Sequence, residues 1–225
     1  MKNKLISISF IAFSALYLLL LLLGKTEIAR YLKPFLLPIL LILVYAFQDF
    51  KTKKNLLTAL TFSWIGYLFL LFVDKGKIYF NLGLLAFIIS HIYYIVLFQK
   101  QSKTQILKHK FVFLIGIALI LTHVIVLLSV LLPNIENSKI PITIYAFVLS
   151  TMLFFALKGS LHWSKPANFF VLLGAVLFVT SDSILAINKF YMELPNATFW
   201  IMLTYLSAQF CITFGILQLN IKSRH

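Results

Sequence analysis

The chain contains six carboxyl side chains that could take part in acid–base chemistry, and one of them has an unusual setting. Asp182 lies well inside an apolar run, within Phe178-Val179-Thr180-Ser181-Asp182-Ser183-Ile184-Leu185. An ionisable group at such a position costs ~2.5–3.5 kcal/mol on membrane-insertion scales, so its presence predicts a role. The other five acids lie in loops or at the ends of apolar runs: Glu27, Asp49, Asp74, Glu136 and Glu193.

The chemistry open to Asp182 follows from its apolar surroundings. A low dielectric favours the neutral acid, which can donate a proton as a general acid. We therefore predict that Asp182 is a proton donor, an ion ligand or an anchor for a substrate headgroup. The structural alternative is an aspartate that bonds to Ser, Thr or Lys near the end of a helix.

The elements that position Asp182 are predicted to be membrane-spanning helices. The chain has 225 residues, of which 61% are hydrophobic and 12% are charged, whereas a soluble domain keeps about a quarter of its residues charged. A membrane helix needs ~20 mostly apolar residues. The sequence predicts a single all-α transmembrane domain over residues 1–225, a polytopic bundle of eight transmembrane helices at about 5–23, 31–48, 55–73, 79–98, 111–131, 139–157, 167–187 and 198–219.

The first apolar run follows Lys2 and Lys4, as in a signal peptide. Its core is longer than that of a signal peptide and no small-residue cleavage site follows, so we expect a retained helix. In the last run, a stripe of small residues predicts a seam where helices pack closely. The stripe consists of Thr204, Ala208, Cys211 and Gly215.

The basic residues predict the orientation, because cytoplasmic loops are enriched in Lys and Arg. Thirteen of the 20 basic residues fall on the side that holds both ends of the chain. This predicts cytoplasmic N and C termini and a multi-pass protein of the cell membrane, which in a bacterium is the inner membrane. The thirteen are Lys2, Lys4, Lys51, Lys53, Lys54, Lys100, Lys103, Lys108, Lys110, Lys158, Lys165, Lys222 and Arg224.

Several classes of function are disfavoured by composition. The net charge of +14 does not indicate nucleic-acid binding, because the basic residues lie in short runs between apolar stretches. The single cysteine, Cys211, excludes a disulfide framework and a cysteine metal site. We expect no metal and no cofactor, and the sequence does not give the oligomeric state.

Other polar residues have predicted depths similar to that of Asp182. At 1.5 Å per residue, Asp182 lies ~8 Å from the outer end of its span, Tyr67 ~9 Å and Tyr205 ~10 Å. Gln209 and His91 lie deeper, at ~16–18 Å. These residues are candidates for lining one cavity that widens toward the outer leaflet, although depth does not show that they face each other.

Each of these residues also has a structural interpretation. Lys33, near the outer start of the second span, either pairs with Asp182, binds a phosphate or extends to the membrane interface. Lys189 is an alternative partner for Asp182. Tyr205 and Gln209 line a polar cavity or bridge helices, and His91 either contacts substrate or is a buried neutral histidine. His123 is isolated in mid-span, and we assign it no role.

Four segments, in order, make the chain resemble the YhhN-like family of integral-membrane lysoplasmalogenases. They cover roughly residues 31–218. The segments are Lys33-Pro34-Phe35-Leu36-Leu37-Pro38, Phe62-Ser63-Trp64-Ile65-Gly66-Tyr67, Gly83-Leu84-Leu85-Ala86-Phe87 with Ser90-His91 and Tyr94, and Gly174-Ala175-Val176-Leu177-Phe178 with Ser181-Asp182.

The resemblance implies hydrolysis of the vinyl-ether bond of lysoplasmalogens to a fatty aldehyde and a glycerophospho-headgroup. Our hypothesis for this reaction takes Asp182 and Tyr67 as catalytic residues and Lys33, Ser181, His91, Tyr205 and Gln209 as substrate-binding residues. The expected partners are a lysophospholipid substrate and membrane lipids.

Tyr67 departs from the family pattern, which has an aspartate after Ser-x-x-Gly. Tyrosine, with a reference pKa of ~10, is a poor base at neutral pH. The alternatives are a working site in which Tyr67 donates a hydrogen bond, a hydrolase for another ether or ester lipid, and a catalytically silent lysolipid-binding protein. A small transporter is a further alternative.

Overall fold

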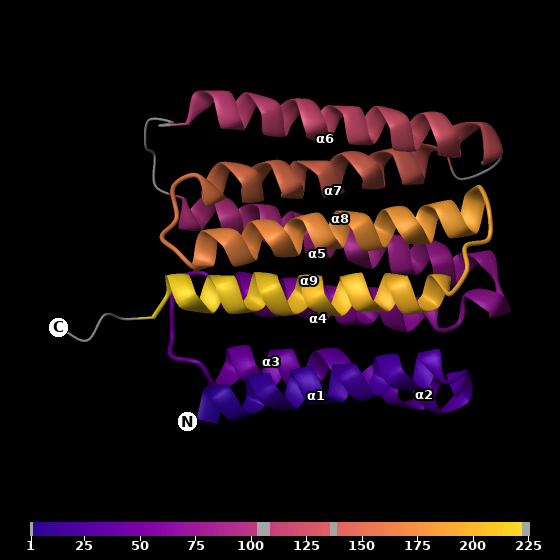
Figure 1. The fold of residues 1–225 in the computed structure, drawn as a ribbon, viewed down its shortest axis with the longest axis horizontal. Coiled ribbons are helices and arrows are strands. Elements are labelled where there is room, and N and C mark those ends of the chain that lie inside the picture. Colours follow the sequence, from indigo (N-terminus) through magenta and orange to yellow (C-terminus); the bar gives the residue numbers. More distant parts are fainter. Residues whose placement is uncertain (1, 103–108, 136–138, 222–225) are drawn as a thin grey trace. The chain divides into compact units, whose positions relative to one another are not determined.

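The computed structural model describes residues 2–102, 109–135 and 139–221, and every regular element in these residues is helical (Figure 1). This confirms the predicted all-α class. The elements are α1 (Lys2–Leu22), α2 (Thr26–Leu32), η1 (Lys33–Phe35), α3 (Leu36–Ala46), α4 (Lys53–Leu70), η2 (Val73–Lys75), α5 (Lys77–Gln101), α6 (Lys110–Leu131), η3 (Leu132–Asn134), α7 (Lys139–Ser160), α8 (Ala167–Phe190) and α9 (Ala197–Leu219).

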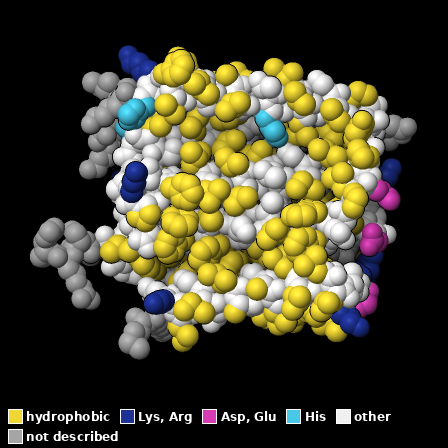
Figure 2. Space-filling model, in the orientation of Figure 1, with side chains coloured by type: hydrophobic (Ala, Val, Ile, Leu, Met, Phe, Trp, Pro, Cys, Tyr) yellow, Lys and Arg dark blue, Asp and Glu magenta, His cyan; other side chains and the backbone are white. Residues whose placement is uncertain are grey.

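The helices have the length and composition of membrane spans. Seven helical stretches in the described residues are long and apolar enough to cross a bilayer, and α4, with 18 residues, is the remaining long helix. Figure 2 shows hydrophobic side chains along the helices and charged ones near helix ends. Since water cannot solvate such surfaces, the chain is a multi-pass membrane protein.

The orientation of the termini stays a prediction. The prediction rests in part on residues outside the described ones, and on Lys2, whose side chain is not described. The residues outside are Lys103, Lys108, Lys222 and Arg224, and the acid Glu136 lies outside as well.

The second span differs from the single helix expected at residues 31–48. It begins at Thr26, and the one-turn 3-10 segment η1 separates α2 from α3. Pro34 and Pro38 explain the break, because proline has no N–H to donate to the carbonyl four residues earlier. The helix therefore begins before the apolar run and includes the charged residues Glu27 and Arg30.

The chain divides into two compact units, Met1–Tyr93 and Tyr94–His225, which we call the N-terminal and C-terminal units. In the N-terminal unit, α3 packs against α1 and α4 around buried leucines such as Leu36, Leu40 and Leu60. The first part of α5 approaches α4 closely at Gly83, where a Cβ would lie 3.1 Å from the Gly66 carbonyl oxygen.

In the C-terminal unit, α6, α7, α8 and α9 pack in that order (Figure 1). The predicted small-residue seam on α9 lies against α8. A Cβ on Gly215 would lie 2.6 Å from Val171 Cγ2, and a Cβ on Gly174 of α8 would lie 2.8 Å from the Ala208 carbonyl oxygen. This close packing fixes the rotation of α8, and therefore the direction in which Asp182 points.

Candidate active site

Asp182 is buried in α8, with 8% of its surface exposed. The hydroxyl of Tyr145, on α7, donates a hydrogen bond to Asp182 Oδ2. A hydrogen bond to a carboxyl group in a dry setting is stronger than in water and restricts its rotation. The structure therefore gives the predicted acid a fixed phenol partner.

Aromatic rings continue from this pair along the C-terminal unit. Tyr205, on α9, lies within electrostatic range of the Tyr145 hydroxyl. Its ring packs edge-on against Phe178, with centroids 5.5 Å apart, and Phe178 packs in the same manner against Tyr94 at 6.5 Å. Of the predicted site residues, Tyr205 is thus one with an observed interaction with Tyr145, the partner of Asp182.

The side chains of Ser181 and Gln209 each form a hydrogen bond within the C-terminal unit. Ser181 Oγ donates to the Ile201 carbonyl oxygen at 3.0 Å, which joins α8 to α9. Gln209, fully buried, accepts a hydrogen bond from the Tyr94 hydroxyl at 2.6 Å. These bonds satisfy buried polar atoms, as the structural interpretation of Gln209 expects.

His123, for which no role was predicted, has a hydrogen-bond partner one residue from Asp182. Its Nε2 lies 3.0 Å from Ser183 Oγ, and that hydroxyl also donates to the Val179 carbonyl oxygen at 2.7 Å. His123 must therefore carry a proton on Nε2 if the Ser183 hydroxyl proton is used on the backbone. The description of His123 as isolated is wrong, because α6 packs beside α8 as well as α7.

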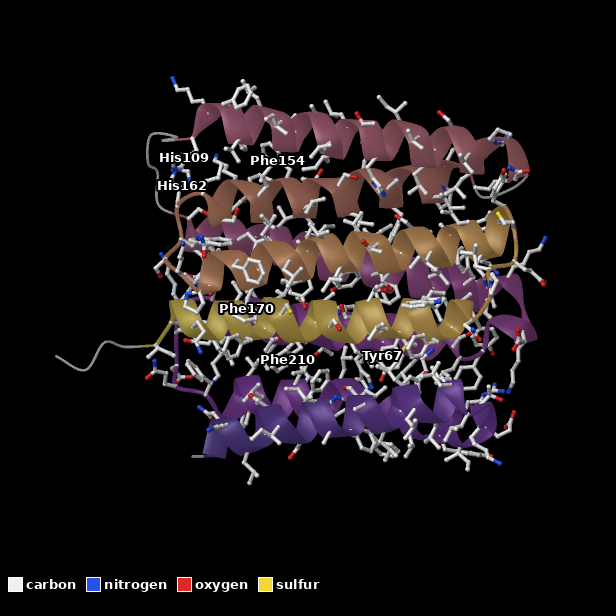
Figure 3. All side chains as sticks on the ribbon, viewed as in Figure 1. Tyr67, His109, Phe154, His162, Phe170 and Phe210 are labelled. Carbon is white, nitrogen blue, oxygen red and sulfur yellow. The ribbon has the colours of Figure 1, made fainter. Side chains whose placement is uncertain are left out.

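In the N-terminal unit, Lys33 and Tyr67 are in direct contact. Tyr67 lies on α4 and is labelled in Figure 3. Its hydroxyl donates to the Lys33 carbonyl oxygen, and the Leu37 amide lies within hydrogen-bonding reach of the same phenol. Tyr67 thus lies between the Lys33 carbonyl and the Leu37 amide, which a regular α-helix would join by a direct hydrogen bond. Lys33 Nζ lies 5.5 Å from the centroid of the Tyr67 ring, a cation–π contact.

Trp64, one turn before Tyr67, supports the same broken segment. Its indole Nε1 donates to the Pro34 carbonyl oxygen at 2.8 Å. In a regular helix that carbonyl would accept from residue 38, but Pro38 has no N–H. Two side chains of α4 therefore hold the polar backbone atoms at the break in the second span.

His91 lies on α5 in the N-terminal unit and is fully buried, with its ring stacked on Phe87 at 6.5 Å. The adjacent Ser90 donates to the Ala59 carbonyl oxygen at 2.8 Å, and its hydroxyl lies 2.7 Å from that of Ser63. Because the Ser90 proton is used on the backbone, Ser63 donates to Ser90 in this pair. The serines join α4 to α5 beside His91.

The predicted site residues thus fall into two groups. Asp182, Ser181, Tyr205 and Gln209 belong to the C-terminal unit, whereas Lys33, Tyr67 and His91 belong to the N-terminal unit. Within the part of the chain that the structure describes, no three His, Cys, Asp or Glu side chains gather as a metal site would require.

Tyr145 is the residue of the site that sequence reasoning missed. It lies six residues after Lys139, the start of its span, which corresponds to a depth of ~9 Å, close to that of Asp182. Matching depth on a neighbouring span was the available signal. Depth alone could not select Tyr145, because none of the four motif segments lies on α7 and the rotation of an apolar helix is not readable from its sequence.

Fold and site together define a polytopic helical membrane protein with a buried carboxyl–phenol pair. The model of the YhhN family matches residues 28–216, which is most of the chain. The chain belongs to the YhhN family.

Relatives with assigned names are similar over shorter stretches. Lysoplasmalogenase TMEM86B of Homo sapiens is 36% identical over 94 residues, which are 40% of this chain and 37% of that protein. The Sus scrofa protein of the same name is 39% identical over 79 residues, 34% of this chain and 30% of its own length. Lysoplasmalogenase TMEM86A of Bos taurus is 28% identical over 177 residues, 74% of this chain and 67% of that protein. No solved structure matches the chain.

Proposed function

We propose that this protein is a membrane lysoplasmalogenase that hydrolyses the vinyl-ether bond of lysoplasmalogens. The observation that carries the proposal is the Asp182 carboxyl, buried in α8 and hydrogen-bonded to Tyr145. Membership of the YhhN family and similarity to proteins named lysoplasmalogenase support the same activity. The substrate would reach the protein from the lipid phase of the cell membrane.

A vinyl ether requires an acid, because it hydrolyses after protonation of its β-carbon. The neutral Asp182 carboxyl gives its proton to that carbon, and the electron pair of the C=C bond forms the new C–H bond. The α-carbon and the ether oxygen then share the positive charge of an oxocarbenium ion, and the aspartate is left as a carboxylate. A nearby carboxylate stabilises such a cation electrostatically.

Water completes the reaction. It adds to the α-carbon, and the proton that it loses returns to the Asp182 carboxylate, which gives a hemiacetal. The bond from the α-carbon to the glycerol oxygen then breaks as that oxygen takes up a proton and the hemiacetal hydroxyl loses one. The products are a fatty aldehyde and a glycerophospho-headgroup, and one water is consumed.

Tyr145 acts in this scheme as a positioning residue. Its hydroxyl donates to Oδ2 and holds the Asp182 carboxyl in place. The substrate contacts predicted for Ser181, Tyr205 and Gln209 stay predictions, since the observed bonds of Ser181 and Gln209 are made within the protein. The roles predicted for Lys33, Tyr67 and His91 in the N-terminal unit stay predictions.

Aldehyde release by the purified protein tests the proposal. The wild type should release fatty aldehyde from lysoplasmalogen in detergent, and Asp182→Asn should lose that activity by at least about a hundredfold, the usual contribution of a general acid. Asp49→Asn is the matched control, because Asp49 lies in the loop before α4 and its side chain is 97% exposed. An Asp182→Asn enzyme with unimpaired turnover would remove the acid role.

Tyr67 favours a second candidate function, a lysolipid-binding protein without turnover. Its proton is used on the Lys33 carbonyl, so the residue in the place of the family aspartate serves the backbone of the second span. A silent wild type that binds lysolipid, together with aldehyde release by Tyr67→Asp, would favour this candidate over hydrolysis.

A further inference from the structure

Two cations lie one helical turn apart at the break in the second span. Arg30 belongs to the last turn of α2, and Lys33 begins η1. They are close enough for the charge of Arg30 to act on Lys33. Two like charges at this spacing repel each other, and a bound anion would relieve that repulsion.

Helix α4 holds both cations in place. Arg30 Nη2 donates to the Leu71 carbonyl oxygen at 3.0 Å, at the end of α4. Tyr67 and Trp64 bind the Lys33 and Pro34 carbonyl oxygens, and Lys33 Nζ lies over the Tyr67 ring. Tyr67 and Trp64 of α4, with the Leu71 carbonyl just after it, thus hold the backbone of the segment and the Arg30 guanidinium, which preorganises the two cations.

No carboxylate forms an ion pair with either cation among the described residues of the N-terminal unit. Arg30 bonds a neutral backbone oxygen, and the ammonium of Lys33 faces an aromatic ring. Glu27, the acid of α2, is exposed in its first turn. Arg30 is exposed and Lys33 is half-buried, so the pair presents positive charge that no carboxylate of this unit neutralises in an ion pair.

We propose that Arg30 and Lys33 form a binding site for the phosphate of a lysophospholipid headgroup. The guanidinium offers a planar set of donors that suits two phosphate oxygens, and the ammonium adds a point charge. Tyr31 and Phe35, which flank the pair, are 75% and 62% exposed. Aromatic side chains favour the membrane interface, and this places the phosphate at headgroup depth with its chain in the hydrocarbon.

This inference depends on the proposed function for the class of lipid and adds Arg30 as a binding residue. Binding is measured on the full-length protein in detergent by isothermal titration calorimetry with three probes. Lysophosphatidylcholine carries the chain and the phosphate, a monoacylglycerol of equal chain length lacks the phosphate, and inorganic phosphate lacks the chain.

Arg30→Gln and Lys33→Gln should each weaken lysophosphatidylcholine binding by about tenfold or more, as expected when one charged hydrogen bond is lost. Monoacylglycerol binding should stay unchanged, which also shows that the variants fold. Lys77→Gln, the matched control, removes an exposed lysine at the start of α5 and should bind as the wild type does.

Three results would overturn the site. They are unchanged lysophosphatidylcholine binding in both variants, an equal loss in Lys77→Gln, and phosphate binding as tight as lysolipid binding, which would make inorganic phosphate the ligand. The aldehyde assay separates this inference from the proposed function. Binding that depends on Arg30 without turnover refutes hydrolysis alone, whereas turnover with unaffected binding in both Arg30→Gln and Lys33→Gln refutes the phosphate site alone.

Discussion

The hydroxyl of Tyr145 donates to the carboxyl of Asp182 across α7 and α8, 37 positions apart in the chain. Both helices present long apolar surfaces, and this bond is a polar contact between them in the C-terminal unit. A buried carboxyl with a fixed partner presents its second oxygen in a defined direction. That geometry is what an acid requires if it is to reach the carbon of a lipid chain and not the nearest water.

Tyr145→Phe should lower turnover of lysoplasmalogen by about tenfold to a hundredfold, because the Tyr145 hydroxyl bonds the carboxylate that Asp182 becomes as it gives up its proton, and a hydrogen bond to a charged group contributes ~1.5–3 kcal/mol. The substitution leaves substrate contacts in place, so KM should change little while kcat falls. Steady-state aldehyde release over a range of substrate concentrations measures both constants.

Tyr191→Phe is the control for the loss of a phenol, since Tyr191 follows α8 and is 55% exposed. The infrared carboxyl band that disappears in Asp182→Asn supplies a second measurement. It should shift in Tyr145→Phe, where Asp182 lacks its donor. An unshifted band with an unchanged kcat would refute the positioning role.

Tyr67→Phe should destabilise the protein by about 0.5–1.5 kcal/mol, because the half-buried Lys33 carbonyl loses the Tyr67 hydroxyl as a donor and keeps the Leu36 amide. Thermal unfolding in detergent measures the change. Tyr93→Phe serves as the comparison, as Tyr93 is exposed on α5 and stacks on Phe62 through its ring. Equal unfolding temperatures for the two variants would show that the Tyr67 hydroxyl does not stabilise the break.

Gly174→Ala should separate α8 from α9 and cost about 1–3 kcal/mol, as overpacking of a close contact usually does. A Cβ there would lie 2.7 Å from Ile212 Cγ1 and 2.8 Å from the Ala208 carbonyl oxygen, so backbone must move. Thr180→Ala, on the exposed face of the same helix, should unfold within a degree or two of the wild type. If Gly174→Ala matches Thr180→Ala, the seam is looser than described.

The loop between α3 and α4 should carry a small pH dependence. Lys53 Nζ donates to Asp49 Oδ1 at 2.9 Å, and this hydrogen bond, together with the charge of Lys53, lowers the pKa of Asp49. The native state therefore favours the ionised form. The resulting stabilisation is present above about pH 4, the ordinary pKa of aspartate, and is lost as pH falls through the lowered value.

Asp49→Asn should remove that dependence. Unfolding temperatures of wild type and variant are compared from about pH 6 to about pH 3, across the ordinary aspartate pKa. The effect should be small, because the carboxyl is exposed and water screens the pair. A wild type that gains stability relative to Asp49→Asn on acidification would contradict the assigned direction.

The sequence was enough to identify several candidate site residues, but it did not predict which residues they contact. Asp182 stood out because one charged residue within a long apolar run is a local, visible anomaly. Tyr145 did not, because a tyrosine in an apolar span is ordinary. Tyr67 was identified from its place in a motif, but its bond to the Lys33 carbonyl depends on a helix break whose geometry no motif records.

The sequence by itself determined the membrane class, the helical fold and approximate spans, since the length and apolarity of a span are properties of consecutive residues. The tertiary structure decided that the second span breaks into α2, η1 and α3, that Tyr145 meets Asp182, and that His123 meets Ser183. Those contacts depend on how each helix rotates about its axis. On helices that are apolar on every side, close packing at glycines such as Gly174 sets that rotation, and the hydrophobic pattern does not.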